Sequence, residues 1–400
     1  MKILVVNNFY YPHQVGGAEE SLRLQCEALV ELGQEVHALT VAHDGVERTH
    51  EINGVLTHYL RTTFFRGSPL HKNRSWLSRV GWQFGAMLQF GTNIKIAQLL
   101  KRERYGIVYV NNLPGIGRAI VIMARALGIP VVAGLRDYAW ICLRQSRFEG
   151  GKNCQSTCMK CRVGCSVRRG ISLSVEGVAA NSATLLTIFH KAGAFKNVPS
   201  RVIYAGAPLA SRIPRDASPP REEGQPLVVG VMGQIQPSKG FDSFLGEVSP
   251  LVESGKIRVI ITGSVHGEYA THLRNAFESE HVEFTGRLER DDFFSRVDVV
   301  VIPSMWNEPL SRITYEALSN GKCVVASTHG GQKEIISHGD NGYIYTPGDG
   351  TLMSILTELI RSPALLEDRE RAAAESAIRY SPQNAASELL ALFEPLVSKP

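Results

Sequence analysis

Residues 297–316 read VDVVVIPSMWNEPLSRITYE, and this stretch predicts a buried strand, a short loop and a helix. The apolar run up to Ile302 is typical of a strand buried on both faces. Pro309 suits the first turn of a helix, where no backbone N–H is needed. Glu308 then falls at the mouth of the predicted helix and Glu316 about two turns inside it, roughly 12 Å away at 1.5 Å per residue.

Two carboxylates at this spacing match the reach from the sugar to the ribose of a nucleotide-sugar. Between them, the first N–H groups of the helix have no partner within the helix. These groups can therefore receive a diphosphate, since a helix N-terminus favours anions.

Predicted strands and helices alternate along the chain, which is typical of parallel sheets with helices on both faces. We predict strands near residues 2–7, 35–40, 55–60, 107–110, 130–134, 176–180, 201–204, 227–232, 257–262, 282–284, 297–302, 322–326 and 342–345. We predict helices near residues 17–32, 83–103, 116–127, 183–191, 239–253, 267–278, 289–295, 310–320 and 350–360. The fold class is therefore α/β, with two doubly wound, Rossmann-like domains and an active site expected in a cleft between them.

A stretch rich in Pro, Arg and Glu separates the two series and is the best linker candidate. We expect an N-terminal, acceptor-binding domain over residues 1–205, a linker over 206–226 and a C-terminal domain over 227–380. The tail is helical by pattern and broken at Pro382, and we expect its last part, residues 381–400, to cross back to the N-terminal domain.

The net charge of +5 hides an asymmetry between the two halves. Residues 1–205 carry a net charge of +13 and the remainder −8, which suggests two domains with different partners. The apolar run at the N-terminus is too short for a signal peptide, and no run of 18 apolar residues occurs. We therefore expect a cytoplasmic protein that binds no nucleic acid.

The basic excess is concentrated in residues 61–104, which hold nine Lys or Arg and one Glu. Aromatic side chains are interleaved with these cations, at Phe64, Phe65, Trp76, Trp82 and Phe84. Such a segment is suited to an anionic membrane surface, which would make the protein peripheral at the cytoplasmic face. A solvated basic helix face above core aromatics explains the same pattern.

Two glycine-containing loops each follow the first predicted strand of a series. The loop with Gly16 and Gly17 follows the strand near 2–7, and the loop with Lys239 and Gly240 follows the strand near 227–232. Gly16 and Gly17 precede a helix and allow a ligand to approach the backbone, although a helix-starting turn without a ligand has the same pattern. Lys239 stands at a helix start, where the helix dipole disfavours a cation. An anion held between Lys239 and the helix would resolve that conflict; a lysine pointing into solvent is the simpler alternative.

A third loop, with Gly330 and Gly331 ahead of Glu334, also permits close backbone approach. Glu334 could accept a hydrogen bond from a sugar hydroxyl. Taken alone this pattern is weak, because glycine pairs usually form turns.

These stretches together resemble the retaining glycosyltransferases of family 4, which have the GT-B fold. Glu308 to Glu316 is similar to the family's E-x7-E motif, and the loops at Gly16–Gly17, Ser238–Gly240 and Gly330–Glu334 recur in the family's order. The resemblance covers nearly the whole chain. It implies that the C-terminal half binds a nucleotide-diphosphate-sugar and the N-terminal half a glycan or lipid-linked saccharide, in the synthesis of surface polysaccharide such as lipopolysaccharide.

The resemblance also implies roles for individual residues. Glu316 would hold the ribose hydroxyls and Glu308 the transferred sugar, with backbone N–H groups of neighbouring residues. Lys239 would neutralise the leaving diphosphate. The further substrate-binding positions are Gly16, Gly17, Gln234, Arg287, Leu288, Leu310, Ser311, Gly331 and Glu334, of which Arg287 and Leu288 would flank the base.

Two positions depart from the family's pattern. Gln234 stands where the family usually has Arg, so stabilisation of the leaving group rests more on Lys239. Arg136 replaces the His that often precedes the acidic residue kept here as Asp137, and it would supply positive charge near the diphosphate. The implied transfer retains configuration and needs no divalent metal or other cofactor; a covalent role for Glu308 is less favoured than a binding role.

Four cysteines, Cys154, Cys158, Cys161 and Cys165, follow a C-x3-C-x2-C-x3-C pattern. A tetrahedral structural zinc site would make this basic loop rigid. Free thiols are the alternative, while the spacing of iron–sulfur enzymes fits poorly with the predicted fold. The segment around 140–170 is an insertion that we expect beside the acceptor site.

Two rival functions use the same predicted architecture. One is an isomerase or phosphorylase acting on nucleotide-sugars or glucans. The other is a catalytically silent binding protein, suggested by Gln234 and Arg136. A dinucleotide-dependent oxidoreductase is disfavoured because the G-x-G-x-x-G fingerprint is missing.

Overall fold

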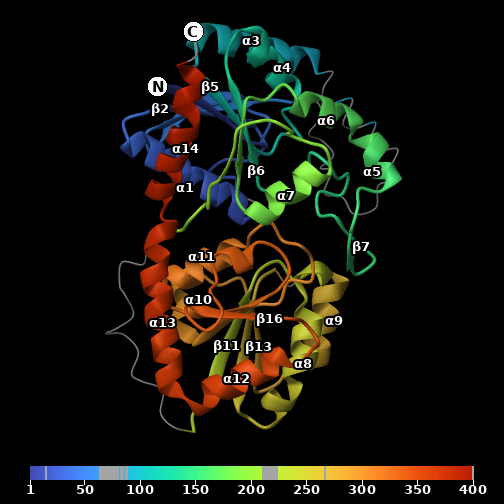
Figure 1. Cartoon of the computed structure of the whole chain (residues 1–400), viewed down its shortest axis with the longest axis vertical. Helices are drawn as coiled ribbons and strands as arrows, with labels where there is room; N and C mark the ends of the chain where they lie inside the picture. The colour runs from blue at the N-terminus through green and yellow to red at the C-terminus, as the bar shows by residue number, and fades with distance from the viewer. Residues whose placement is uncertain are drawn as a thin grey trace. The chain divides into compact units, whose positions relative to one another are not determined.

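The computed structural model describes residues 1–13, 16–62, 81, 85, 89–209, 224–264 and 267–398. The chain divides into two compact units (Figure 1). Unit 1 comprises Met1–Arg147, Cys154–Ala205 and Pro382–Pro400, and unit 2 comprises Phe148–Asn153 and Gly206–Ser381. The division between the large segments falls at Ala205 and Gly206, where the sequence placed the start of a linker.

Unit 2 is built on a six-stranded parallel sheet with the order β13-β12-β11-β14-β15-β16. Chain order reverses between β11 and β14, so this sheet has the Rossmann order with its switch point there. The strands are β11 (Leu227–Met232), β12 (Ile257–Thr262), β13 (Val282–Gly286), β14 (Val299–Ile302), β15 (Cys323–Ser327) and β16 (Gly342–Tyr345). The helices between and after them are α8 (Phe241–Glu253), α9 (Glu268–Phe277), α10 (Arg290–Arg296), α11 (Arg312–Ser319), α12 (Thr351–Arg361) and α13 (Pro363–Ala377).

Unit 1 is built on an eight-stranded sheet with the order β10-β9-β6-β5-β1-β2-β4-β3, whose switch point lies between β1 and β5. Its strands are β1 (Lys2–Val6), β2 (Glu35–Val41), β3 (Arg48–Ile52), β4 (Val55–Leu60), β5 (Ile107–Val110), β6 (Val131–Leu135), β9 (Gly177–Ala180) and β10 (Ser200–Val202). Its helices are α1 (Gly17–Glu31), α3 (Phe90–Glu103), α4 (Ala119–Ala126), α5 (Met159–Gly164), α6 (Ser166–Ser172), α7 (Ala183–Lys191) and α14 (Pro382–Val397).

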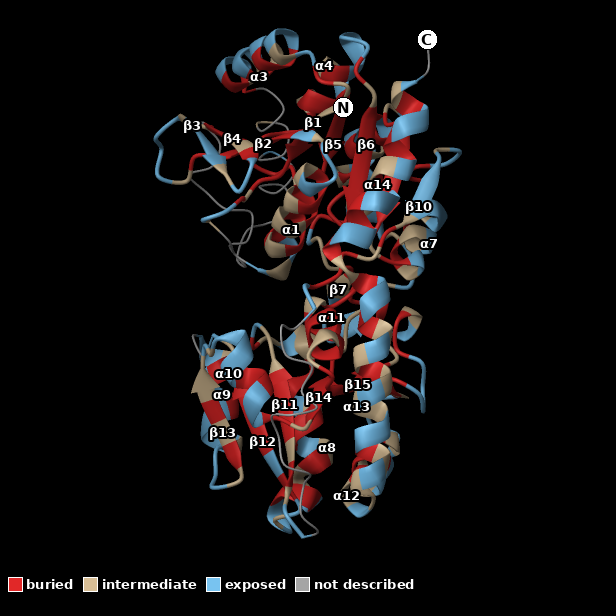
Figure 2. Ribbon diagram, turned by 90° about the vertical axis from the view of Figure 1, so that its left-hand side faces the viewer, coloured by how far each residue is buried: buried red, intermediate tan, exposed pale blue. Residues whose placement is uncertain are grey.

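The last helix, α14, belongs to unit 1 although it follows the whole of unit 2 along the chain. Its apolar face contains Leu389, Leu392 and Phe393, which join the core formed by strand residues such as Ile3 and Val5. Figure 2 shows the central strands of both units, such as β5, β6, β11 and β14, in the buried colour and exposed residues on helices such as α12 and α14. Burial of these continuous apolar runs is the dominant stabilising term for both sheets.

The sequence missed elements that lack an apolar pattern. Strand β3 pairs antiparallel with β4 at the sheet edge, and its central residues are exposed. The two-residue strands β7 (Phe148–Glu149) and β8 (Lys152–Asn153) form an antiparallel hairpin in unit 2. The short helices α5 and α6 occupy the cysteine-containing segment. The basic segment 61–104 lies largely outside the described residues, apart from its ends and helix α3.

No helix among the described residues is long and apolar enough to cross a membrane.

Glu370 on α13 provides a test of the packing between this helix and β15. Burial, opposed by Lys322 and reinforced by Asp298, raises the pKa of Glu370 from 4.5 to about 7. The folded state therefore holds this proton more tightly than the unfolded state, so stability falls as the pH rises from about 4.5 to about 7.

We predict that Glu370→Gln stabilises the protein by about 1–3 kcal/mol at pH 8 and gives no gain at pH 4, because the neutral amide needs no proton. Urea unfolding followed at both pH values measures the difference. Glu375→Gln, an exposed position on the same helix, is the control and should change stability little at either pH. An equal effect of Glu370→Gln at pH 4 and pH 8 would contradict the assignment.

Candidate nucleotide-sugar site

The polar residues of unit 2 gather at its switch point, where the loops after β11 and β14 leave the carboxyl edge of the sheet. The loop after β11 ends in a short 3-10 turn, Pro237–Lys239. The loop after β14 runs from Pro303 to Ser311, which caps α11. Ligands of open parallel sheets bind at this edge, so the two loops define the candidate site.

Lys239 and Glu308, predicted separately from two distant motifs, form an ion pair. Lys239 Nζ lies 2.5 Å from Glu308 Oε1, and Ser304 Oγ donates to Glu308 Oε2 over 2.6 Å. The side chains of the lysine and the glutamate are 19% and 9% exposed. The Trp306 ring also lies near the ammonium group, with its centroid 6.0 Å from Nζ. Both oxygens of Glu308 are therefore held, and the lysine is the more exposed partner of the pair.

Glycines let three loops meet at Glu308. Gly330 has a φ of +94°, and a Cβ there would lie 2.0 Å from the carbonyl oxygen of Glu308. A Cβ at Gly240, whose φ is +74°, would lie 2.1 Å from the carbonyl oxygen of Pro303. Gly331 N donates to Glu308 O over 3.0 Å. Only glycine permits these approaches, which explains both glycine motifs by packing around the site.

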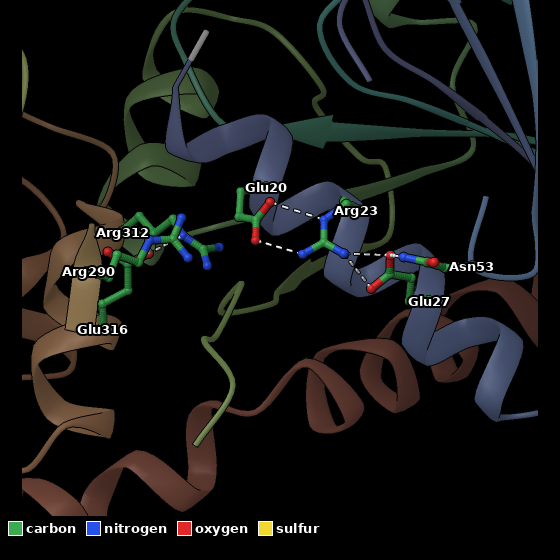
Figure 3. Close-up of polar contacts among 7 residues, drawn as sticks. All are labelled: Glu20, Arg23, Glu27, Asn53, Arg290, Arg312 and Glu316. Carbon is green, nitrogen blue, oxygen red and sulfur yellow. Dashed lines mark hydrogen bonds and ion pairs between the residues drawn. The ribbon is translucent and has the colours of Figure 1, made fainter. Parts of the chain in front are cut away.

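Glu316 lies on α11 and is also paired with cations. Its Oε1 accepts from Arg312 Nε at 2.5 Å and lies 3.1 Å from Arg290 Nε. Figure 3 shows the two guanidinium groups converging on this carboxylate. Arg312 is one turn before Glu316 on the same helix, whereas Arg290 begins α10. The glutamate side chain is 8% exposed, and the two arginines fix its orientation.

The predicted start of this helix was wrong by two residues. Helix α11 begins at Arg312 with Ser311 as its N-cap, so Pro309 and Leu310 lie in the loop. The Glu308 carbonyl accepts from Gly331 N, and Pro309 and Leu310 follow in the loop that leads to the N-cap. Glu316 is consequently little more than one turn inside the helix.

The remaining predicted positions of unit 2 are placed around the same edge. Gln234 and Arg287 are exposed, and Leu288 N donates to Thr262 Oγ1 over 3.1 Å. Leu310, Ser311 and Gly331 are buried in the loops near Glu308. Glu334 is half-buried and ends the 3-10 turn Gln332–Glu334.

In unit 1 the predicted residues lie at the carboxyl edge around the switch point between β1 and β5. Gly16 N donates to Glu19 Oε2 over 2.9 Å, and Gly17 begins α1. Arg136, which follows β6, donates to Asn111 Oδ1 over 3.1 Å and also to Gln25 Oε1. Burial raises the pKa of Glu19, which is placed beside this guanidinium.

Asp137 is placed differently from Arg136, although the two are adjacent. Its carboxylate accepts from Ala139 N over 2.7 Å and faces the buried cations Arg118 and Arg168. Burial and the neighbouring Arg168 lower the pKa of Arg118 to about 9, and burial raises the pKa of Asp137. This arrangement is an internal charge cluster, with Arg118 also 4.8 Å from the Trp140 ring centroid.

Helix α1 is held by a second polar network, drawn in Figure 3. Arg23 bridges Glu20 at 2.8 Å and Glu27 at 2.7 Å. Asn53, in the turn between β3 and β4, donates to Glu27 over 2.7 Å. The network fixes the helix that begins at Gly17.

The cysteine cluster is arranged around Cys161, whose thiol interacts with those of Cys142, Cys158 and Cys165. Hydrogen bonding with Cys161 and burial raise the pKa of Cys142, which keeps this thiol protonated. The four cysteines predicted as a zinc site included Cys154, whereas in the structure Cys142 is the further thiol that contacts Cys161. Among the described residues, no group of three or more His, Cys, Asp or Glu side chains is arranged to hold a metal ion.

The sequence analysis gave no role to several polar residues of these sites. Arg290 and Arg312 pair with Glu316, Ser304 binds Glu308, and Asn111 binds Arg136. The sequence could have indicated Asn111 and Ser304. Asn111 directly follows the buried strand β5, and Ser304 lies two residues after the end of the buried strand β14.

Two family models match the chain, one over each series of strands and helices. A glycosyl transferase 4-like domain matches residues 16–204, and the glycosyl transferases group 1 model matches residues 226–361. Together they cover well over half of the chain. The chain therefore belongs to the glycosyltransferases that these models describe.

Known proteins agree with this membership. An uncharacterized 42.6 kDa protein in the cps region of Klebsiella pneumoniae is 26% identical over 336 residues, 84% of this chain and 87% of that protein. The lipopolysaccharide core biosynthesis mannosyltransferase LpcC of Rhizobium leguminosarum bv. viciae is 26% identical over 223 residues, 50% of this chain and 59% of its own.

A solved structure, that of Anabaena Alr3699/HepE in complex with UDP, superposes with a TM-score of 0.70 at 19% identity. The match covers 99% of this chain and 100% of that chain. It confirms the predicted GT-B fold with its two Rossmann-like domains.

The glycine at position 330 tests how tightly the loops are packed at Glu308. We predict that Gly330→Ala destabilises the protein by about 2 kcal/mol more than Gly339→Ala does. Both glycines have positive φ, but nothing lies within 4 Å of a Cβ at Gly339. Thermal unfolding of the two variants, compared with the wild type, measures the difference. Equal losses of stability would mean that the backbone of Glu308 moves freely.

Proposed function

We propose that this chain is a retaining, metal-independent hexosyltransferase of family 4 type. It takes a sugar from a nucleotide-diphosphate-sugar and adds it to a glycan or lipid-linked saccharide during the synthesis of a surface polysaccharide. The observation that carries the proposal is the pairing of Lys239 with Glu308 at the switch point of unit 2, with Glu316 on the adjoining helix.

Lys239 is the residue proposed to bind the leaving diphosphate. An ammonium group has three N–H donors, and Glu308 takes one of them, so the others can be given to phosphate oxygens. The ion pair also fixes the direction of the lysine side chain. Charge that develops on the diphosphate in the transition state then meets a cation already in place.

Glu308 is proposed to orient Lys239 and to contact the transferred sugar. Both of its oxygens already accept hydrogen bonds, from Lys239 and Ser304, which makes it a weak nucleophile. This favours a binding role over covalent catalysis. The acceptor's proton is then taken by the departing phosphate oxygen.

Glu316 is proposed to hold the ribose. Arg312 and Arg290 both interact with Oε1, so Oε2 is the oxygen oriented to accept from the ribose hydroxyls. The first N–H groups of α11 lie between this residue and Glu308 along the chain, and the helix N-terminus favours the diphosphate.

The acceptor is assigned to unit 1, where Gly16, Gly17 and Arg136 lie at the carboxyl edge of the sheet. Glu19 and Asn111 are added to the predicted set by their contacts. Surface polysaccharide synthesis is supported by two relatives, one in a cps region and one a lipopolysaccharide core biosynthesis enzyme. Anabaena HepE has also been solved with UDP-glucose, which supports a nucleotide-sugar donor.

Nucleotide binding is the test of this proposal. We expect UDP, GDP or ADP to raise the melting temperature of the wild type, because ligand binding to the folded state stabilises it. Glu316→Gln should weaken binding about ten- to hundredfold, as expected for a lost hydrogen bond to a charged group. Glu358→Ala, which removes an exposed carboxylate from α12, is the matched control and should bind as the wild type does.

Release of nucleoside diphosphate separates an enzyme from a silent binding protein. Lys239→Ala should reduce turnover of the donor sugar about 10²- to 10³-fold. Activity should survive EDTA, and the product should keep the anomeric configuration of the donor. Absence of a melting shift with all three nucleotides would sink the proposal.

A further inference from the structure

The hairpin β7–β8 belongs to unit 2 although it lies within the chain of the N-terminal half. Its turn is made by Gly150 and Gly151, both at positive φ, and its second strand ends at Asn153. The hairpin is part of the segment 140–170, which the sequence assigns to the acceptor side. Its contacts place it instead with the sheet that carries Lys239 and Glu308.

Asn153 makes two hydrogen bonds to the backbone of the loop after β14. Its Nδ2 donates to Met305 O over 2.8 Å, and Asn307 N donates to its Oδ1 over 2.6 Å. A primary amide used in this way pairs with the loop as a neighbouring strand would, through one donor and one acceptor. The side chain therefore fixes the path of the backbone on both sides of Trp306.

Residues 305–307 of this loop also lie beside the Lys239–Glu308 ion pair. Met305 N and Trp306 N both donate to Ser238 O, over 2.9 Å and 3.2 Å, which ties the loop to the residue before Lys239. Glu308 N donates to Trp306 O over 2.7 Å. Displacement of Trp306 would therefore move the ring beside Lys239 and the backbone of Glu308 together.

We propose that Asn153 is a positioning residue of the donor site, and this inference rests on the proposed function. Asn153 holds the loop 305–307 so that Trp306 and Glu308 remain in place around Lys239. The donor site of unit 2 is accordingly completed by a hairpin from the N-terminal half of the chain. Loss of the Asn153 amide should weaken binding of the diphosphate, the proposed partner of Lys239, more than binding of the ribose, the proposed partner of Glu316.

Calorimetric titration of the full chain with UDP, GDP and ADP, and with UMP, GMP and AMP, tests this inference. We expect Asn153→Ala to weaken binding of the preferred nucleoside diphosphate roughly tenfold, the effect of about two hydrogen bonds, and to change binding of the monophosphate less than threefold. The ratio of the two affinities is the decisive readout, because general destabilisation would lower both equally. Gln155→Ala, an exposed change two residues away, should leave the ratio unchanged.

Two further variants sharpen the test. Asn153→Asp keeps the acceptor for Asn307 N–H but cannot donate to Met305 O, so its affinity should lie between those of the wild type and Asn153→Ala. It also serves if Asn153→Ala fails to fold. In the background of Lys239→Ala, the change Asn153→Ala should have little additional effect, because the two act on the same phosphate contact.

The outcomes distinguish failure of the proposed function from failure of the proposed role of Asn153. Failure of the wild type to bind any nucleotide overturns the proposed function and this inference with it. Normal binding by the wild type with an unchanged affinity ratio in Asn153→Ala and Asn153→Asp overturns only the role of Asn153. Additive losses in the double variant would likewise show that Asn153 does not act through Lys239.

Discussion

The site in unit 2 depends on one constraint, the fixing of Glu308 through both its backbone and its side chain. Its N–H binds Trp306 O and its carbonyl accepts from Gly331 N, while Lys239 and Ser304 occupy its carboxylate. Three loops must come within van der Waals distance for this to happen, and glycine at position 330 makes the approach sterically feasible. An acidic residue held this firmly can orient a cation, because its carboxylate stays in one position.

Charge is compensated locally in each part of the molecule. Glu308 is paired with one cation and Glu316 with two, and in unit 1 Asp137 faces two buried arginines. Hydrogen bonds and cations replace water around these partly buried carboxylates. Two arginines on one glutamate leave an excess of positive charge beside Glu316, which suits an anionic ligand such as the proposed nucleotide better than a neutral sugar alone.

The sequence predicted the parallel strands well because a strand buried on both faces must be continuously apolar, as in Val299–Ile302 and Cys323–Ser327. It failed at β3, where the edge strand is exposed and carries no apolar pattern. It placed the start of α11 two residues too early, because Pro309 fits the loop before an N-cap as well as the first turn of a helix. The motifs gave Lys239, Glu308 and Glu316 by residue type and context, but the pairing of Lys239 with Glu308 is a tertiary fact that spacing alone does not encode.

The same reasoning explains why Asn153 was invisible to sequence analysis. An asparagine after two glycines indicates a turn, and nothing local shows that its amide will bind a loop more than 150 residues later. The four cysteines that follow the hairpin suggested metal binding, whereas the hairpin's own contacts are with the loop that leads to Glu308. A hairpin inserted in the N-terminal half of the chain thus contacts the candidate site of unit 2, so the composition of the insertion is a poor guide to the substrate that it helps to bind.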